Sequence, residues 1–131
     1  MIIAQTLLDN LTTQAKASSS LRMNLDLPDS PEDQSLRMLN VNEPETVLPT
    51  YRHRTISETV VCFRGHFEEC FFDEGRRLTE TNDMVPDRLF FIFPAGQWHS
   101  LKYLESGTML LECKDGTWES LGEEDILKIE K

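Results

Sequence analysis

YRHRTISETVVCFRG, residues 51–65, is the stretch that decides how this chain is interpreted. It contains the spacing His53-x4-Glu58-x6-Gly65, with an apolar run at residues 60–63 after the glutamate. A short run of this kind, rich in β-branched and aromatic residues, is typical of a β-strand, and a glycine after the strand favours a turn. One imidazole and one carboxylate are therefore expected on neighbouring extended segments.

A second stretch, FPAGQWHS at residues 93–100, carries the spacing Pro94-x-Gly96-x2-His99. Proline and glycine predict a tight turn that presents the histidine at the start of the next strand. With the histidine and glutamate of the first stretch, this makes two imidazoles and one carboxylate. Non-haem iron sites use such a set and keep coordination positions open for substrate.

Short strand candidates separated by turn residues surround both stretches. Many short strands at this spacing predict an all-β sandwich or barrel. We expect the strands at about residues 36–41, 45–51, 57–64, 67–72, 88–93, 99–104 and 108–114.

The ends of the chain add three further elements. Apolar residues recur at helical spacing through residues 2–17, which predicts an amphipathic helix that must pack on a partner to be stable. Residues 21–27 alternate apolar and polar side chains, which predicts a half-buried strand, and residues 28–34 (PDSPEDQ) predict a loop. The charged tail at residues 121–131 could form a short strand or helix.

Size and charge narrow the function classes. At 131 residues we expect an N-terminal helix at 1–19 and a single barrel domain at 20–131. A net charge of −10 repels phosphate backbones, so nucleic acid is not an expected partner. No stretch approaches the roughly 20 apolar residues that span a bilayer, so a membrane is not expected either.

The cysteines and the N-terminus predict a compartment. Cys62, Cys70 and Cys113 are an odd, widely spaced set without a C-x-x-C pair, which is typical of reduced thiols in a cytoplasmic protein. The first 20 residues have neither a basic region nor a continuous apolar core, so no secretion signal is expected.

Side-chain parity tests whether the candidate residues can meet. On an extended segment, residues two apart share a face. A barrel that turns the relevant faces inward would gather two histidines, one glutamate and two tyrosines in one cavity. These residues are Tyr51, His53, Glu58, His99 and Tyr103.

The two motifs resemble those of the cupin superfamily, G-x5-H-x-H-x3,4-E-x6-G and G-x5-P-x-G-x2-H-x3-N. Over roughly residues 20–124, the segments SLRMLN, LPTYRHRTISETVVCFRG and FPAGQWHSLKYLESGTMLLECKDG are similar to the WbuC-type cupin fold metalloproteins. The resemblance implies an all-β fold, a small antiparallel cupin barrel or jelly roll, here with an N-terminal helix.

Several motif positions depart from the family pattern. Tyr51 stands where the first histidine of the H-x-H pair is found, Arg88 replaces the opening glycine of the second motif, and Tyr103 replaces its closing asparagine. Tyr51 is a further candidate ligand, although a phenol with a pKa near 10 coordinates poorly unless the metal lowers that value. The matched positions, which the resemblance makes metal ligands, are His53, Glu58 and His99.

The resemblance also implies a cofactor and a ligand class. The cofactor is a divalent metal (Fe, Zn, Ni or Mn), held more weakly than in a four-ligand cupin or absent, and no organic cofactor is expected. The ligand is a small polar molecule, such as a sugar or sugar acid linked to surface polysaccharide synthesis. Tyr51 and Tyr103 are the candidate catalytic groups.

Several interpretations stay open from the sequence. His53 could be a surface histidine with Glu58 solvated, or the barrel could have lost tight metal binding. The function could be that of a metal enzyme, a ligand-binding barrel without catalysis, or a metal-free enzyme that uses histidine and tyrosine as base and acid. His66 fits neither motif and is expected in a solvated turn.

Other charged residues have two interpretations each. Arg22, Asn24 and Arg37 could bind an anionic substrate or line a solvated strand edge. Glu112 and Lys114, inside the apolar stretch TMLLECK, either face water or line a pocket. Because an added strand at residues 21–27 would lie at a sheet edge, where chains pair readily, we expect a homodimer.

Overall fold

The computed structural model describes residues 3–27, 35–46, 48–88, 91–116 and 122–127, so the loop expected at 28–34 lies outside the described residues. One α-helix precedes a series of strands, as predicted. The elements are α1 (Gln5–Ala17), β1 (Arg22–Asp26), β2 (Leu36–Asn42), β3 (Thr50–Tyr51), β4 (Glu58–Arg64), β5 (Phe67–Phe72), β6 (Leu78–Met84), β7 (Phe91–Phe93), β8 (Trp98–Tyr103), β9 (Thr108–Lys114), the 3-10 helix η1 (Glu123–Asp125) and β10 (Ile126–Leu127).

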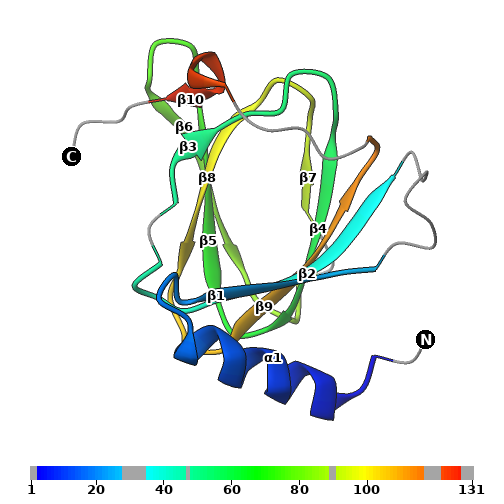
Figure 1. The fold of residues 1–131 in the computed structure, drawn as a ribbon. Coiled ribbons are helices and arrows are strands. Elements are labelled where there is room, and N and C mark those ends of the chain that lie inside the picture. Colours follow the sequence, from blue (N-terminus) through cyan, green and yellow to red (C-terminus); the bar gives the residue numbers. More distant parts are fainter. Residues whose placement is uncertain (1–2, 28–34, 47, 89–90, 117–121, 128–131) are drawn as a thin grey trace.

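The strands form two five-stranded antiparallel sheets that face each other (Figure 1). The first sheet has the order β1-β2-β9-β4-β7, and the second has the order β10-β3-β8-β5-β6. Neighbouring strands in a sheet are mostly distant in sequence, as in a jelly roll. The prediction of an all-β antiparallel fold with an N-terminal helix is therefore confirmed.

The α1 helix lies across the outside of the first sheet, against β1 and β2 (Figure 1). Its apolar side buries Leu8, Leu11 and Ala15 against Leu39 and Val41 of β2. Each leucine buried in this way contributes roughly 1.5–3 kcal/mol. The helix thus finds its partner on the outer face of a sheet.

A second apolar cluster fills part of the space between the sheets. It extends from the inner faces of β4 and β9 to those of β5 and β8. Its buried members are Val60, Cys62, Phe67, Phe71, Met84, Phe93, Leu101, Tyr103 and Leu110.

Two predicted strands are shorter than expected. Residues 45, 46, 48 and 49 are not in a strand, because the Thr46 N–H closes a turn on the Glu43 carbonyl and Pro49 has no N–H to donate. Only β3 remains of that segment. The strand predicted at 88–93 begins at Phe91, since the Arg88 N–H is bonded to the Val85 carbonyl in a turn.

One strand was missed, and the tail was anticipated. The β6 strand has a mostly exposed, polar sequence, LTETNDM, that carries no apolar alternation. The tail forms both η1 and β10, in agreement with the two forms expected for it. Among the described residues, no helix is long and apolar enough to cross a membrane.

Candidate metal centre

The two sequence motifs are joined directly through the backbone. The Gly96 N–H donates to the His53 carbonyl at 2.7 Å, and Gly96 has a φ of +82°, a conformation that glycine adopts without strain. Tyr51 of β3 pairs directly with His99 of β8. On its other side β3 pairs with β10, which extends the sheet beyond the site.

The glycine that ends the first motif serves close packing. Gly65 has a φ of +79°, and a Cβ there would lie 2.3 Å from Thr108 Oγ1. Any side chain at this position would collide with the neighbouring strand. The Thr108 hydroxyl also accepts from the His66 N–H at 3.2 Å, so this corner fixes the end of β4.

His53 and Glu58 meet inside the molecule. Their Nε2 and Oε1 atoms are 2.8 Å apart, and the side chains are only 11% and 2% exposed. The distance permits an ion pair, but His53 Nε2 and both Glu58 carboxylate oxygens lack a partner with hydrogen-bond geometry. The interpretation of His53 as a surface residue and Glu58 as solvated is therefore wrong.

His99 has its ring oriented by one hydrogen bond. Its Nδ1 lies 2.9 Å from the Gln97 carbonyl, which can only accept, so Nδ1 carries the proton. The lone pair is then on Nε2, which is buried and has no partner. Burial lowers the pKa of His99, which favours the neutral imidazole that metals bind.

Tyr51 completes a triangle of rings. Its ring centroid is 4.5 Å from that of His99 and 5.4 Å from that of His53, while the two imidazoles are 6.5 Å apart. Burial, and then the charges of Glu112 and Glu58, raise the pKa of Tyr51 above its usual value. The phenol is therefore neutral in the site as it stands.

Lys114 places a cation beside the acidic groups. Its Nζ lies 3.7 Å from Glu58 Oε1 and 3.6 Å from Glu112 Oε2. Burial tends to raise the pKa of Glu58, but the contact with His53 and the charge of Lys114 outweigh it and lower that pKa. Burial and the charge of Glu58 raise the pKa of Glu112 to about 7.

The buried atoms without partners are suited to a metal. Two imidazole nitrogens and a carboxylate form a donor set for first-row divalent ions, and donors that share one ion at about 2.1 Å and at right angles lie roughly 3 Å apart. The His53–Glu58 separation is of that size. Yet no three His, Cys, Asp or Glu side chains within the described ranges are grouped closely enough to hold an ion as they stand.

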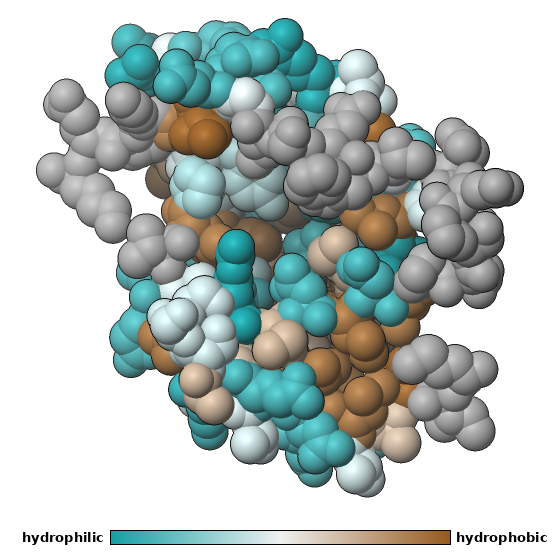
Figure 2. All heavy atoms as spheres, viewed as in Figure 1, coloured by the Kyte–Doolittle hydropathy of each residue, from teal (hydrophilic) through white to brown (hydrophobic). Residues whose placement is uncertain are grey.

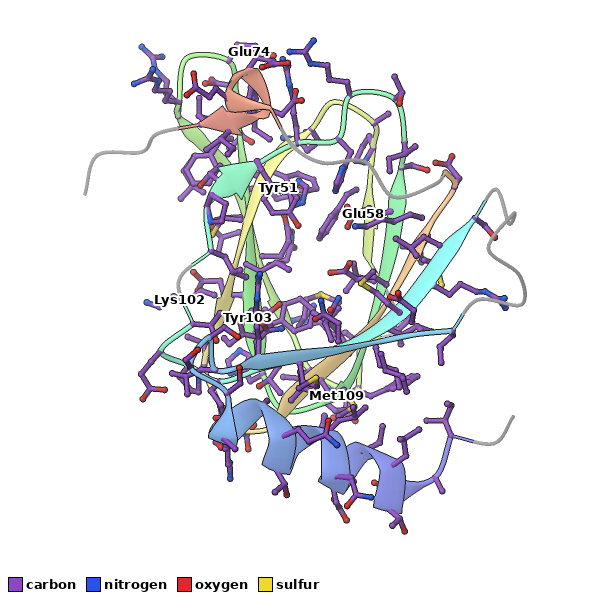
Figure 3. The ribbon with its side chains drawn as sticks, in the orientation of Figure 1. Tyr51, Glu58, Glu74, Lys102, Tyr103 and Met109 are labelled. Carbon is purple, nitrogen blue, oxygen red and sulfur yellow. The ribbon has the colours of Figure 1, made fainter. Side chains whose placement is uncertain are left out.

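A pocket of about 180 Å³ adjoins these residues. On the face shown in Figure 2, hydrophilic and hydrophobic residues meet around a hollow in the middle of the molecule. Tyr51 and Glu58 point into the space between the sheets from opposite sides, and Tyr103 lies nearby (Figure 3). The pocket is lined by Arg22, Asn24, Met38, Asn40, Asn42, Leu48, Tyr51, Leu101, Tyr103, Glu112 and Lys114.

The lining of the pocket shows which of the charged residues with two interpretations face it. Arg22, Asn24, Glu112 and Lys114 line it, whereas Arg37 is not among its lining residues. Sequence reasoning missed two buried amides on β2, Asn40 and Asn42. The available signal was the polar residue at every second position, which parity alone could not assign to the inside. His66 is half-buried and pairs with Asp83, as a turn residue can.

Comparison with protein families gives one match. The model described as "Domain of unknown function (DUF6016)" matches residues 3–84, more than half of the chain. No curated protein matches this chain.

Several solved structures share the fold at low sequence identity. CapF of Staphylococcus aureus, a capsular polysaccharide assembling protein, matches with a TM-score of 0.62 and 16% identity over 73% of this chain and 26% of its own. KdgF from Halomonas sp. gives 0.59 and 15% over 74% of this chain and 81% of its own. Bacillus subtilis oxalate decarboxylase, described with Mn(II) centres, gives 0.59 and 20% over 82% and 28%.

These matches bear on the fold alone. The S. pombe Cnp3 cupin domain also matches, with a TM-score of 0.60 at 15% identity, so the chain has a cupin fold, as the sequence resemblance implied. The chain spans only about a quarter of CapF and of oxalate decarboxylase. The narrower likeness to WbuC-type proteins stays a prediction.

Proposed function

The chain belongs to the family described as a domain of unknown function (DUF6016), and we propose that it is a metal-binding cupin that holds a small polar ligand in the pocket beside the metal. The ligands to the metal would be His53, Glu58 and His99, with Tyr51 next to them. The metal would be a divalent first-row ion such as Fe, Zn, Ni or Mn.

One observation carries this proposal: four buried atoms of these three residues, two imidazole nitrogens and two carboxylate oxygens, have no partner with hydrogen-bond geometry, although His53 Nε2 and Glu58 Oε1 lie 2.8 Å apart. An unpaired buried polar group costs about 1–3 kcal/mol, so such atoms gathered at one place favour a further partner. A divalent cation would accept lone pairs from all three side chains. The Gln97 carbonyl already holds His99 in the tautomer that coordination requires.

The adjoining pocket supports a ligand-binding role. A bound ion would act as a Lewis acid that polarises an oxygen of the ligand. Around it, the chain supplies amides, phenols and charged groups that can orient a polar molecule. The capsular polysaccharide role of CapF supports, by fold analogy only, a sugar or sugar acid linked to surface polysaccharide synthesis.

A metal titration tests the proposal. Wild type and His99→Ala are titrated with Zn²⁺, Ni²⁺ and Mn²⁺ under identical conditions, with His66→Ala as the control because His66 lies outside the site. We expect His99→Ala to weaken binding by at least about tenfold, and His66→Ala to leave it unchanged. Tyr51→His should raise the affinity, since a neutral imidazole binds these ions better than a phenol. Equal binding by all four proteins would refute the metal site.

A second candidate function, a metal-free ligand-binding barrel, is favoured by Lys114. Its ammonium group lies beside Glu58 and Glu112, and it already neutralises charge where a metal would do so. In that case the pocket would bind its ligand without a metal and without catalysis, and a metal-free enzyme would instead use a histidine and a tyrosine as base and acid.

Lys114→Met separates the two candidates. Under the metal proposal, removal of a cation within 4 Å of a metal ligand should raise affinity for Zn²⁺, because the two positive charges no longer repel. Under the metal-free candidate, the variant should bind no more Zn²⁺ than wild type and should be less stable, because Glu58 and Glu112 lose their compensating charge.

We also propose that the protein forms a homodimer. Among the described residues β1 is the last strand of its sheet, and this edge supports pairing with a second copy and a homodimer. Light scattering at micromolar concentration should give twice the mass of one chain. A monomer mass would contradict the dimer without affecting the metal site.

A further inference from the structure

The inner faces of β1 and β2 are polar, although they look into the space between two sheets. In the ladder, Arg22 lies opposite Asn42 and Asn24 lies opposite Asn40. All four line the pocket. A jelly-roll interior normally takes apolar side chains from each strand. This part of the interior therefore departs from a packing core.

The two asparagines on β2 turn their amides into the pocket. Asn40 and Asn42 are buried as residues, with 8% and 4% exposure, and both line the pocket. No hydrogen bond joins either side-chain amide to another described residue, and neither amide is among the buried polar atoms that lack a partner. The amides are therefore open to the pocket and available to a ligand there. Each amide offers two donors and one acceptor, a combination that suits hydroxyl groups.

Arg22 adds a cation at the exposed side of the same ladder. It forms no ion pair with another residue that the structure describes. The other cation that lines the pocket, Lys114, is already shared between two carboxylates. Arg22 is therefore the pocket cation available to an anion, and its planar guanidinium fits a carboxylate through two parallel hydrogen bonds.

The size and the apolar wall of the pocket limit the ligand further. A volume of about 180 Å³ is below the roughly 300–1,000 Å³ of pockets for drug-sized molecules. Leu48 and Leu101 give it an apolar side that can cover the C–H face of a ring or chain. A molecule of about one monosaccharide unit fits these limits.

We propose that Arg22, Asn40 and Asn42 form the specificity site for a small hydroxylated carboxylate, with Arg22 holding the carboxylate and the asparagines holding hydroxyls. The proposal deepens the function given above and rests on the pocket being the ligand site. With a net charge of −10, the protein repels anions at long range, so selection of an acid requires such a local cation.

Binding of three probes tests the assignment. D-galacturonate carries a carboxylate and hydroxyls, D-galactose has the hydroxyls without the acid, and cyclohexanecarboxylate has the acid without the hydroxyls. Each is titrated into the full chain by NMR, with and without Zn²⁺. We expect galacturonate to bind at least about tenfold more tightly than either of the other two, since both halves of the site are needed.

Variants assign each half of the site. Arg22→Gln should weaken galacturonate about tenfold or more and leave galactose unchanged, because only the acid meets the guanidinium. Asn42→Leu should weaken both galacturonate and galactose. Arg77→Gln is the matched control: it removes an exposed arginine outside the pocket and should change nothing.

The outcomes separate this inference from the proposed function. Absence of galacturonate binding, or equal binding by wild type and Arg22→Gln, overturns the specificity site. If Arg22→Gln loses galacturonate but keeps wild-type Zn²⁺ affinity, the site stands. If no protein binds Zn²⁺ and Arg22→Gln still loses galacturonate, the metal centre fails while the specificity site stands.

Discussion

The two faces of the first sheet differ although the same strands build both. On the outer face, Leu39 and Val41 of β2 pack against α1 and are fully buried. On the inner face, the alternate residues of β2 are Met38, Asn40 and Asn42, which line the pocket. At β2 the sheet therefore places apolar residues outside, under the helix, and polar residues inside, whereas the inner faces of β4 and β9 also carry apolar residues of the core.

The two faces have different roles: the outer face stabilises the fold, and the inner face lines the pocket. The outer face can bury apolar area because α1 covers it, at about 25 cal/mol for each Å² removed from water. The inner face contributes less, since its amides and charges resist desolvation. A strand can carry a ligand site on one face without loss of the fold when its other face has its own apolar layer.

The largest expected effect comes from breaking the outer face. Leu39→Ala removes a fully buried side chain and leaves a cavity beneath α1, which should lower the free energy of unfolding by roughly 2–5 kcal/mol. Urea denaturation measures it. Leu78→Ala, at a side chain that is 56% exposed, is the control and should change stability by less than about 0.5 kcal/mol. Similar losses in both would mean that α1 does not stabilise the sheet.

Glu69 tests a polar group that lies inside but away from the pocket. It is fully buried on the same side of β5 as Phe67 and Phe71, and Glu69 Oε2 accepts from the Asn82 amide at 3.2 Å. Burial raises the pKa of Glu69 to about 7. Because the folded state then binds the proton more tightly than the unfolded chain, stability is full near pH 4 and falls as the pH rises towards 7.

Glu69→Gln should remove this loss of stability. The free energy of unfolding of the variant minus that of wild type should increase by up to roughly 3 kcal/mol from pH 4 to pH 8. Denaturation of both proteins at both pH values measures it. Glu45→Gln, at an exposed glutamate whose charge does not act on Glu69, provides the control. A gain that is the same at both pH values would show that the Glu69 carboxyl does not titrate between them.

The smallest expected effects on stability come from two adjacent residues of β2, one on its inner face and one on its outer face. Asn40→Leu puts an apolar side chain with the same branching at an inner position beside the pocket and should be neutral or stabilise by up to about 1 kcal/mol. Val41→Thr puts a hydroxyl into the outer apolar layer and should destabilise by about 1–2 kcal/mol. Thermal unfolding measures both. Destabilisation by Asn40→Leu equal to that by Val41→Thr would contradict the difference between the faces.

The fold was predictable where local patterns and packing agree. The short apolar run after Glu58, followed by a glycine, predicted β4, and helical spacing predicted α1. The β6 strand was not predicted, because an edge strand of mostly exposed polar residues shows no alternation of apolar and polar side chains. The strand expected at 45–51 was too long because a turn that ends at Thr46 and a proline at position 49 interrupt the segment.

For the site, the sequence predicted only which residues share a face of the same strand. Parity placed Tyr51 with His53, and His99 with Tyr103, on common faces. It could not say which face of β2 lies inside, because an apolar alternation looks the same under a helix as in a barrel. The buried amides Asn40 and Asn42 were missed for that reason. The contacts of Lys114 with two carboxylates depend on the pairing of β4 with β9, which no local pattern contains.

Paramagnetic broadening by Mn²⁺ tests the central claim most directly, because it locates the ion as well as detecting it. Substoichiometric Mn²⁺ is added to the labelled protein, and the loss of each backbone amide signal is followed by NMR. The signals of Tyr51, Glu58 and His99 should disappear first, while those of α1 stay sharp. First losses at the acidic turn Glu123–Asp125, or along α1, would mean that the ion binds the acidic surface and that the inner site is not a metal centre.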